Sequence, residues 1–129
     1  MKRVIFLIFL FSFMLSSCSK NEIKIDKNNL LIGTWIYSHS TVDASVYSRA
    51  QDFTQTTGYR FNLDGTLIER NLSGFCATPP VSYSDYSGTW TILKENLIQV
   101  NRTNYDGPKS YKLDIQLVTT DSLKVVPIN

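Results

Sequence analysis

The chain has 129 residues, of which 43% are hydrophobic and 19% charged, and its formal net charge is +2. This length suits one domain with its own hydrophobic core. Lys2 and Arg3 account for the whole positive excess, so the charges from residue 18 onward balance. No basic patch points to nucleic acid, and no acidic tail is present. We therefore expect a monomeric domain without a nucleic-acid partner.

The N-terminus has the parts of a bacterial export signal. Lys2 and Arg3 are followed by a nearly continuous apolar run over residues 4–14. A membrane-spanning helix needs about 20 apolar residues, so this run is too short to span and fits the apolar core of a signal peptide. Ser16 and Ser17 then precede Cys18. We predict a leader over residues 1–17.

Leu15-Ser16-Ser17-Cys18 resembles the bacterial lipobox. By that resemblance Cys18 takes a diacylglyceryl thioether, the leader is removed, and the new amine is acylated, for example with palmitate. Several acyl chains on one residue anchor a protein firmly in the lipid bilayer. An ordinary secretory leader that contains a cysteine is the alternative. We expect a lipid-anchored protein of the cell envelope, and Ser19 after the cysteine favours the outer membrane by analogy. The periplasmic face and the cell surface both remain open.

Two further features are the segment that follows Cys18 and the second cysteine. Residues 18–29 are mostly polar and charged, which predicts a lipidated cysteine followed by a flexible tether. Cys76 is the only other cysteine, so an intramolecular disulfide is excluded once Cys18 carries lipid. We expect Cys76 to be buried rather than reactive, because free cysteine is among the most buried residue types.

From residue 30 to residue 129 apolar and polar residues alternate, which indicates short antiparallel strands. Asp64-Gly65 separates two alternating runs and predicts a tight hairpin turn. The region 44–57 is open to a strand, a short helix or a loop lid. The expected strands cover residues 34–40, 59–63, 66–70, 86–92, 97–102, 111–117 and 123–126.

Seven or eight consecutive short strands leave two exposed edges unless the sheet closes. Closure gives a small all-β, antiparallel up-and-down barrel, whose interior holds side chains or one small ligand. We therefore predict such a barrel over residues 30–129.

Several residues in order resemble the lipocalins. Gly33-Thr34-Trp35 matches the Gly-x-Trp of their first strand, and Gly88-Thr89-Trp90 repeats it. Together with residues 59–66 and 121–123, these are similar to the lipocalin-like lipoproteins of Bacteroidetes-type bacteria. The resemblance implies a calycin-like barrel and a small hydrophobic ligand. In lipocalins a late arginine packs over the first tryptophan, whereas the last arginine here is Arg102, which argues against a deep, pre-formed cavity.

Catalytic and metal-binding patterns are weak. His39 is the only histidine, and Cys76 has no partner at metal-ligand spacing. Residues 38–40 place serine and histidine side chains on alternating faces of a strand, unlike a nucleophile–base pair. The aspartates lie near predicted turns, where they serve the backbone. We expect no enzyme activity, no cofactor and no metal.

Aromatic side chains are the most informative candidates for a site. They share the apolar faces of three predicted strands and would meet inside a closed barrel: Trp35, Tyr37, Tyr59, Phe61 and Trp90. They form either a solid core or a small hydrophobic pocket. In the second case tyrosine hydroxyls or Arg60 would lie at the mouth, with residues 75–86 as a rim.

We therefore expect a membrane-anchored envelope lipoprotein whose lipocalin-like domain binds a small apolar or amphipathic ligand. The alternative is a structural module that contacts an envelope protein or a glycan and binds no small ligand. A hydrolase or an enzyme inhibitor is a weaker third interpretation.

Overall fold

The structure is a computed structural model that describes residues 30–74 and 79–129. The expectations for the leader, for Cys18 and the tether that follows it, and for Cys76 concern residues outside these ranges. No helix in the described ranges is long and apolar enough to cross a membrane.

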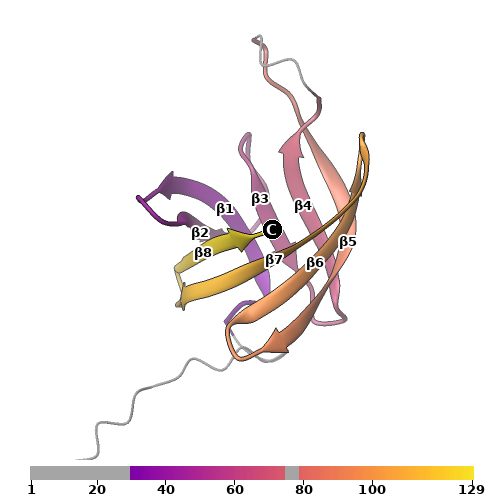
Figure 1. The fold of residues 1–129 in the computed structure, drawn as a ribbon. Helices are drawn as coiled ribbons and strands as arrows, with labels where there is room; N and C mark the ends of the chain where they lie inside the picture. Colours follow the sequence, from indigo (N-terminus) through magenta and orange to yellow (C-terminus); the bar gives the residue numbers. More distant parts are fainter. Residues whose placement is uncertain (1–29, 75–78) are drawn as a thin grey trace, which may run out of the picture.

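Eight strands make up the fold, and they are joined mostly by short turns (Figure 1). Their bounds are β1 (Gly33–Ser40), β2 (Ser45–Ala50), β3 (Gly58–Phe61), β4 (Thr66–Leu72), β5 (Tyr83–Lys94), β6 (Leu97–Asn104), β7 (Gly107–Val118) and β8 (Ser122–Ile128). Every strand expected from the alternating pattern is present, and the open region 44–57 contributes β2.

The eight strands form one closed antiparallel barrel in the order β1-β2-β8-β7-β6-β5-β4-β3. The expected all-β barrel is therefore confirmed. Strands β3 to β8 follow one another as a simple meander, but β2 pairs with β8 and β1 pairs with β3. The connection 51–57 must consequently pass β1 to reach β3.

This connection lies on the outer face of the barrel. The Tyr37 amide donates a hydrogen bond to the Thr57 carbonyl at 2.8 Å. The Phe53 ring lies under two outward-facing guanidinium groups, with ring-centroid distances of 4.9 Å to Arg60 and 4.7 Å to Arg70. Cation–π contacts of this kind stabilise an otherwise exposed segment. The crossing is thus fastened to β3 and β4 and does not close over the barrel as a lid.

The Asp64-Gly65 turn forms as the sequence predicts. Gly65 has a φ of +86°, which glycine adopts without a steric penalty. The Asp64 carboxylate accepts hydrogen bonds from the Thr66 amide at 2.9 Å and the Thr66 hydroxyl at 2.7 Å. The Gly65 carbonyl accepts the Trp90 amide at 2.9 Å, which joins the turn to β5.

Inward-facing side chains fill one end of the barrel. Those with no exposed surface are Leu31, Trp35, Phe61, Ile98, Val100, Leu113 and Leu123. A water-sized space beside any of them would expose part of its surface, so these side chains pack directly against one another. We call this the closed end of the barrel. The opposite end, where β1, β4 and β6 finish, is the mouth.

Candidate functional site

The five aromatic residues expected inside the barrel all face its interior. Trp35 and Phe61 are fully buried, Trp90 and Tyr59 are 2% and 8% exposed, and Tyr37 is half-buried. Four of them join Tyr47 in a column of rings from the mouth to the closed end. Successive centroids along Tyr37, Tyr47, Tyr59, Phe61 and Trp90 are 5.9, 5.3, 5.7 and 5.6 Å apart.

Trp35 lies outside this column and packs at the closed end. Its indole Nε1 donates to the Leu31 carbonyl at 2.9 Å. The Arg49 guanidinium covers the ring, with Cζ 4.2 Å from the centroid. An arginine therefore packs over the first tryptophan after all, but it comes from β2 and not from late in the chain.

Each nitrogen of the Arg49 guanidinium makes a hydrogen bond to a backbone carbonyl. Nε donates to Thr120 at 2.5 Å, Nη1 donates to Ile32 at 3.0 Å, and Nη2 donates to Leu30. Gly33 makes room for this group, because a Cβ there would lie 2.5 Å from Arg49 Nη1. Its φ of +133° also disfavours any other residue. Arg49 thus joins the start of β1 to the β7–β8 turn.

The mouth contains a buried ion pair that the sequence analysis missed. Arg102 Nε donates to Glu69 Oε2, and the two side chains are 10% and 6% exposed. Glu69 Oε2 also accepts the Tyr111 hydroxyl at 2.5 Å, and Oε1 accepts Asn71 Nδ2 at 3.2 Å. The Tyr59 hydroxyl lies 3.4 Å from that of Tyr111. Both oxygens of the Glu69 carboxylate are therefore hydrogen-bonded.

The Arg102 guanidinium is less completely bonded than its partner. Its Nη1 is buried and makes no hydrogen bond to any described residue. The guanidinium lies between the rings of Tyr86 and Tyr111, 5.9 Å from each centroid. Gly88 lies opposite Arg102 on β5, where a Cβ would lie 2.1 Å from the Asn101 carbonyl oxygen and 2.9 Å from Arg102 Cβ. Gly88 therefore allows close approach of the β6 backbone, whereas Gly33 makes room for the guanidinium of Arg49.

Burial also affects the acidity of the interior tyrosines. It raises the pKa of the Tyr47 hydroxyl to about 12 and holds the pKa of Tyr59 and Tyr111 well above their usual value, with the Glu69 charge adding to each shift. Burial alone would lower the pKa of Arg102, but the Glu69 charge and Tyr111 outweigh it and raise that pKa. At neutral pH the mouth therefore holds neutral tyrosine hydroxyls beside a charged arginine.

Arg60 does not lie at the mouth, so that expectation is wrong. Its neighbours Tyr59 and Phe61 face inward, and strand alternation places Arg60 on the outer face. There its guanidinium donates to Thr34 Oγ1 at 2.8 Å and to Asp52 Oδ1 at 2.5 Å. The same alternation identifies Arg102, since Ile98 and Val100 precede it on the inward face of β6. That signal was present in the sequence.

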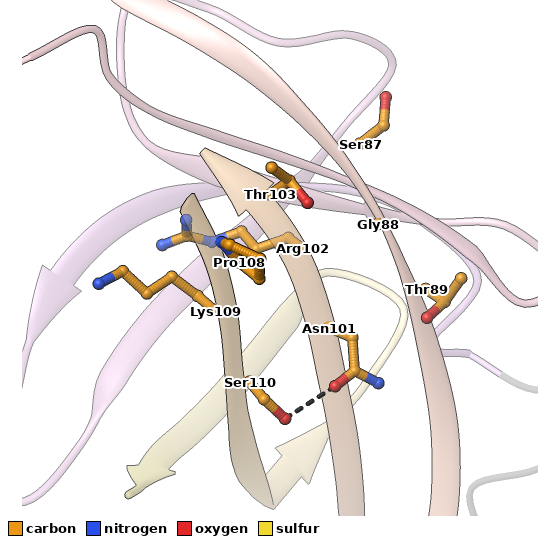
Figure 2. Close-up of a pocket in the computed structure, with 9 residues that line it drawn as sticks. All are labelled: Ser87, Gly88, Thr89, Asn101, Arg102, Thr103, Pro108, Lys109 and Ser110. Carbon is orange, nitrogen blue, oxygen red and sulfur yellow. Dashed lines mark hydrogen bonds between the residues drawn. The ribbon is translucent and has the colours of Figure 1, made fainter. Parts of the chain in front are cut away.

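A second candidate site is a groove of about 280 Å³ on β5, β6 and β7. Figure 2 shows its uncharged polar side chains on neighbouring strands, with Ser110 Oγ donating to Asn101 Oδ1 at 2.7 Å. The groove is lined by Ser87, Gly88, Thr89, Asn101, Arg102, Thr103, Pro108, Lys109 and Ser110. Hydroxyl and amide groups of this kind suit an uncharged polar partner.

Few chemically reactive groups lie together. A β-bulge between Tyr37 and His39 interrupts the expected alternation, and the Ser38 hydroxyl lies 3.1 Å from His39 Nδ1 on the exposed surface. Within residues 30–74 and 79–129, no three His, Cys, Asp or Glu side chains gather in a group that could hold a metal ion.

Comparisons with known proteins do not extend these observations. No protein-family model, no curated protein and no solved structure matches the chain.

Proposed function

We propose that this protein is a lipid-anchored envelope protein whose barrel binds a small amphipathic molecule at its mouth. The closed end acts as a rigid floor, and the site is shallow. The observation that carries this proposal is the contrast along the barrel axis. Trp35 and Phe61 have no exposed surface, whereas Tyr37, Tyr86 and Tyr111 at the mouth are half-buried.

The chemistry of the mouth supports this function. Half-buried tyrosine rings offer apolar faces together with hydroxyl groups, a combination that suits a molecule with a hydrocarbon part and a polar part. The column that starts at Tyr37 continues inward through Tyr47 to the buried Tyr59, so an apolar group at the mouth would meet aromatic surface.

Anchoring through Cys18 is the other half of the proposal, and it depends on the lipobox resemblance. Labelled palmitate should attach to the wild-type chain and fractionate with membranes. The Cys18→Ala variant should lose the label and be released from membranes. Palmitate attached to that variant would contradict the proposed lipidation site.

Ligand binding is tested on the mature chain, residues 18–129 with Cys18→Ala, which carries no lipid of its own. Fatty acids, sterols and haem are titrated while intrinsic tyrosine and tryptophan fluorescence is recorded. A saturable change that Tyr86→Ala weakens supports binding at the mouth. Lack of any response across the panel would contradict the proposed function.

The groove on β5 to β7 favours a second candidate function. An envelope glycan or protein could bind there, because serine, threonine and asparagine side chains line the groove beside the two cationic residues Arg102 and Lys109. Replacing Asn101 and Thr89 by alanine should then abolish capture of a glycan without changing the response to amphipathic ligands. An unchanged glycan-binding profile would exclude this function for the groove.

A further inference from the structure

The mouth contains one strong hydrogen-bond donor that the fold does not use. Arg102 is nine-tenths buried, and its Nη1 makes no hydrogen bond to any described residue. Leaving a buried charged donor unsatisfied is costly, so such groups are normally paired. Arg49 in the same barrel is fully bonded, because each nitrogen of its guanidinium donates a hydrogen bond to a backbone carbonyl.

Glu69 does not bond to Nη1 in the structure, because its oxygens accept hydrogen bonds from other donors. Oε2 accepts from Arg102 Nε and from Tyr111, and Oε1 accepts from Asn71. Glu69 therefore fixes one edge of the guanidinium and leaves Nη1 to another acceptor. Tyr86 and Tyr111 flank the guanidinium plane, which restricts the direction from which that acceptor can approach.

We propose that Arg102 is the head-group subsite of the mouth and binds the carboxylate of an amphipathic acid through Nη1. This inference rests on the proposed function and adds the chemical class of the ligand. A planar guanidinium is well suited to a carboxylate, because its N–H groups form a fork that matches two oxygens.

The charges that face Arg102 allow a second carboxylate beside Glu69. Lys109 is the cross-strand partner of Arg102 on β7 and brings a second positive charge to the same end of the barrel. It is 46% exposed and pairs with Asp106 at 3.0 Å, so it would have to leave this carboxylate to reach an incoming anion. The hydroxyls of Tyr59 and Tyr111 also lie here, and burial holds the pKa of both well above the usual value, so neither adds a negative charge at neutral pH.

The site also requires a path to Nη1, which is covered in the structure. The side chains next to Arg102 are those of Tyr86, Tyr111 and Lys109, and none of them is fully buried. Rotation of exposed and half-buried side chains is fast and needs no change in the strands. A carboxylate entering from the mouth would therefore displace side chains only, with its hydrocarbon part against the tyrosine rings.

The experiment compares four ligands of equal chain length: a fatty acid, its methyl ester, the alcohol and the amine. Calorimetry on the chain of residues 18–129 with Cys18→Ala gives each Kd. We expect the acid to bind about 10- to 100-fold more tightly than the alcohol, the range of one charge-assisted hydrogen bond. Arg102→Lys, which keeps the charge but loses the fork, should remove most of this preference.

Two further variants keep the test decisive. Glu69→Leu with Arg102→Met removes the whole pair and guards against misfolding of a single variant. It should bind the acid and the alcohol equally. Arg70→Met is the matched control, because Arg70 pairs with Asp85 on the outer face, and its preference for the acid should equal that of the wild type.

The possible failures are distinct. Equal affinity for acid, alcohol and amine in the wild type would overturn the carboxylate subsite and leave binding at the mouth intact. A preference for the acid that survives in both Arg102 variants would also overturn it. No binding of any of the four ligands would overturn the proposed function, and the subsite with it.

Discussion

Arg49 and Arg102 lie at opposite ends of the same barrel and differ in how completely they are bonded. Arg49 donates to three backbone carbonyls and covers Trp35, so it locks the closed end. Arg102 donates through Nε to Glu69, but its buried Nη1 makes no hydrogen bond to any described residue. The first arrangement stabilises the fold. The second costs stability, and a ligand that reached Nη1 would repay part of that cost.

Truncation at the closed end should have the largest effect on stability. Trp35→Ala removes a fully buried indole, its bond to Leu31 and the surface on which Arg49 rests. We expect the free energy of unfolding to fall by about 3–5 kcal/mol. Urea denaturation followed by circular dichroism measures this loss. A change below about 1 kcal/mol would show that the closed end does not hold the fold.

Breaking the ion pair at the mouth should cost nearly as much, but the loss should be reversible by a second change. Arg102→Met leaves Glu69 buried without its partner and should destabilise the chain by about 3–5 kcal/mol. Glu69→Leu together with Arg102→Met should restore most of the wild-type stability. If the double variant is as unstable as the single one, the pair contributes packing that hydrophobic side chains do not replace.

High pH should weaken the mouth before it affects the closed end. The folded pKa of Tyr47 is about 12, above the ordinary value of 10.0. The contribution of neutral Tyr47 to the free energy of unfolding is complete below about pH 10. It is lost as the pH rises toward 12, because Tyr47 ionises at a lower pH in the unfolded chain than in the folded protein. This shift of about two units corresponds to roughly 2–3 kcal/mol.

Urea denaturation in steps from pH 8 to pH 12 measures that dependence. Tyr47→Phe, which cannot ionise at this position, should show a shallower decline. An identical decline in the two proteins would assign the alkaline loss to other groups.

The smallest effect on stability is expected for substitution of Gly33, the glycine that leaves space for the Arg49 guanidinium. Gly33→Ala introduces a Cβ that would lie 2.5 Å from Arg49 Nη1 on a backbone with positive φ. We expect a loss of about 1–3 kcal/mol. Gly33→Ala combined with Arg49→Ala relieves the contact but keeps the backbone strain. Thermal melting of the two variants separates the steric contact from the backbone strain. Equal stability of Gly33→Ala and the wild type would contradict both effects.

Alternation and turn chemistry were sufficient to predict most of the fold. The strand over residues 111–117 and the Asp64-Gly65 turn were both predicted, although a β-bulge between Ile115 and Leu117 breaks the expected alternation and leaves Leu117 exposed. The path of residues 51–57 could not be predicted, because it depends on Phe53 packing under Arg60 and Arg70 across the outer face. That contact joins residues of three separate segments and has no local pattern.

The site was predicted only in its apolar part. Tyr37, Tyr59, Phe61 and Trp90 were expected inside, and their rings do form a column there. The ion pair was missed because Glu69 and Arg102 are 33 residues apart, and the arginine was sought on β3. Strand alternation places both residues inward, but their pairing depends on the registers of β4 and β6 against β5, which lies between them.

A backbone and side-chain NMR titration tests the central contrast most directly. The mature chain, residues 18–129 with Cys18→Ala, is titrated with a long-chain fatty acid. The chain has two tryptophans, and the indole N–H of Trp35 reports on the closed end, while Arg102 Nε–H reports on the mouth. The account predicts large shifts at Arg102, Tyr86 and Tyr111 and an unchanged Trp35 indole. Shifts centred on Trp35, or none at Arg102, would contradict it.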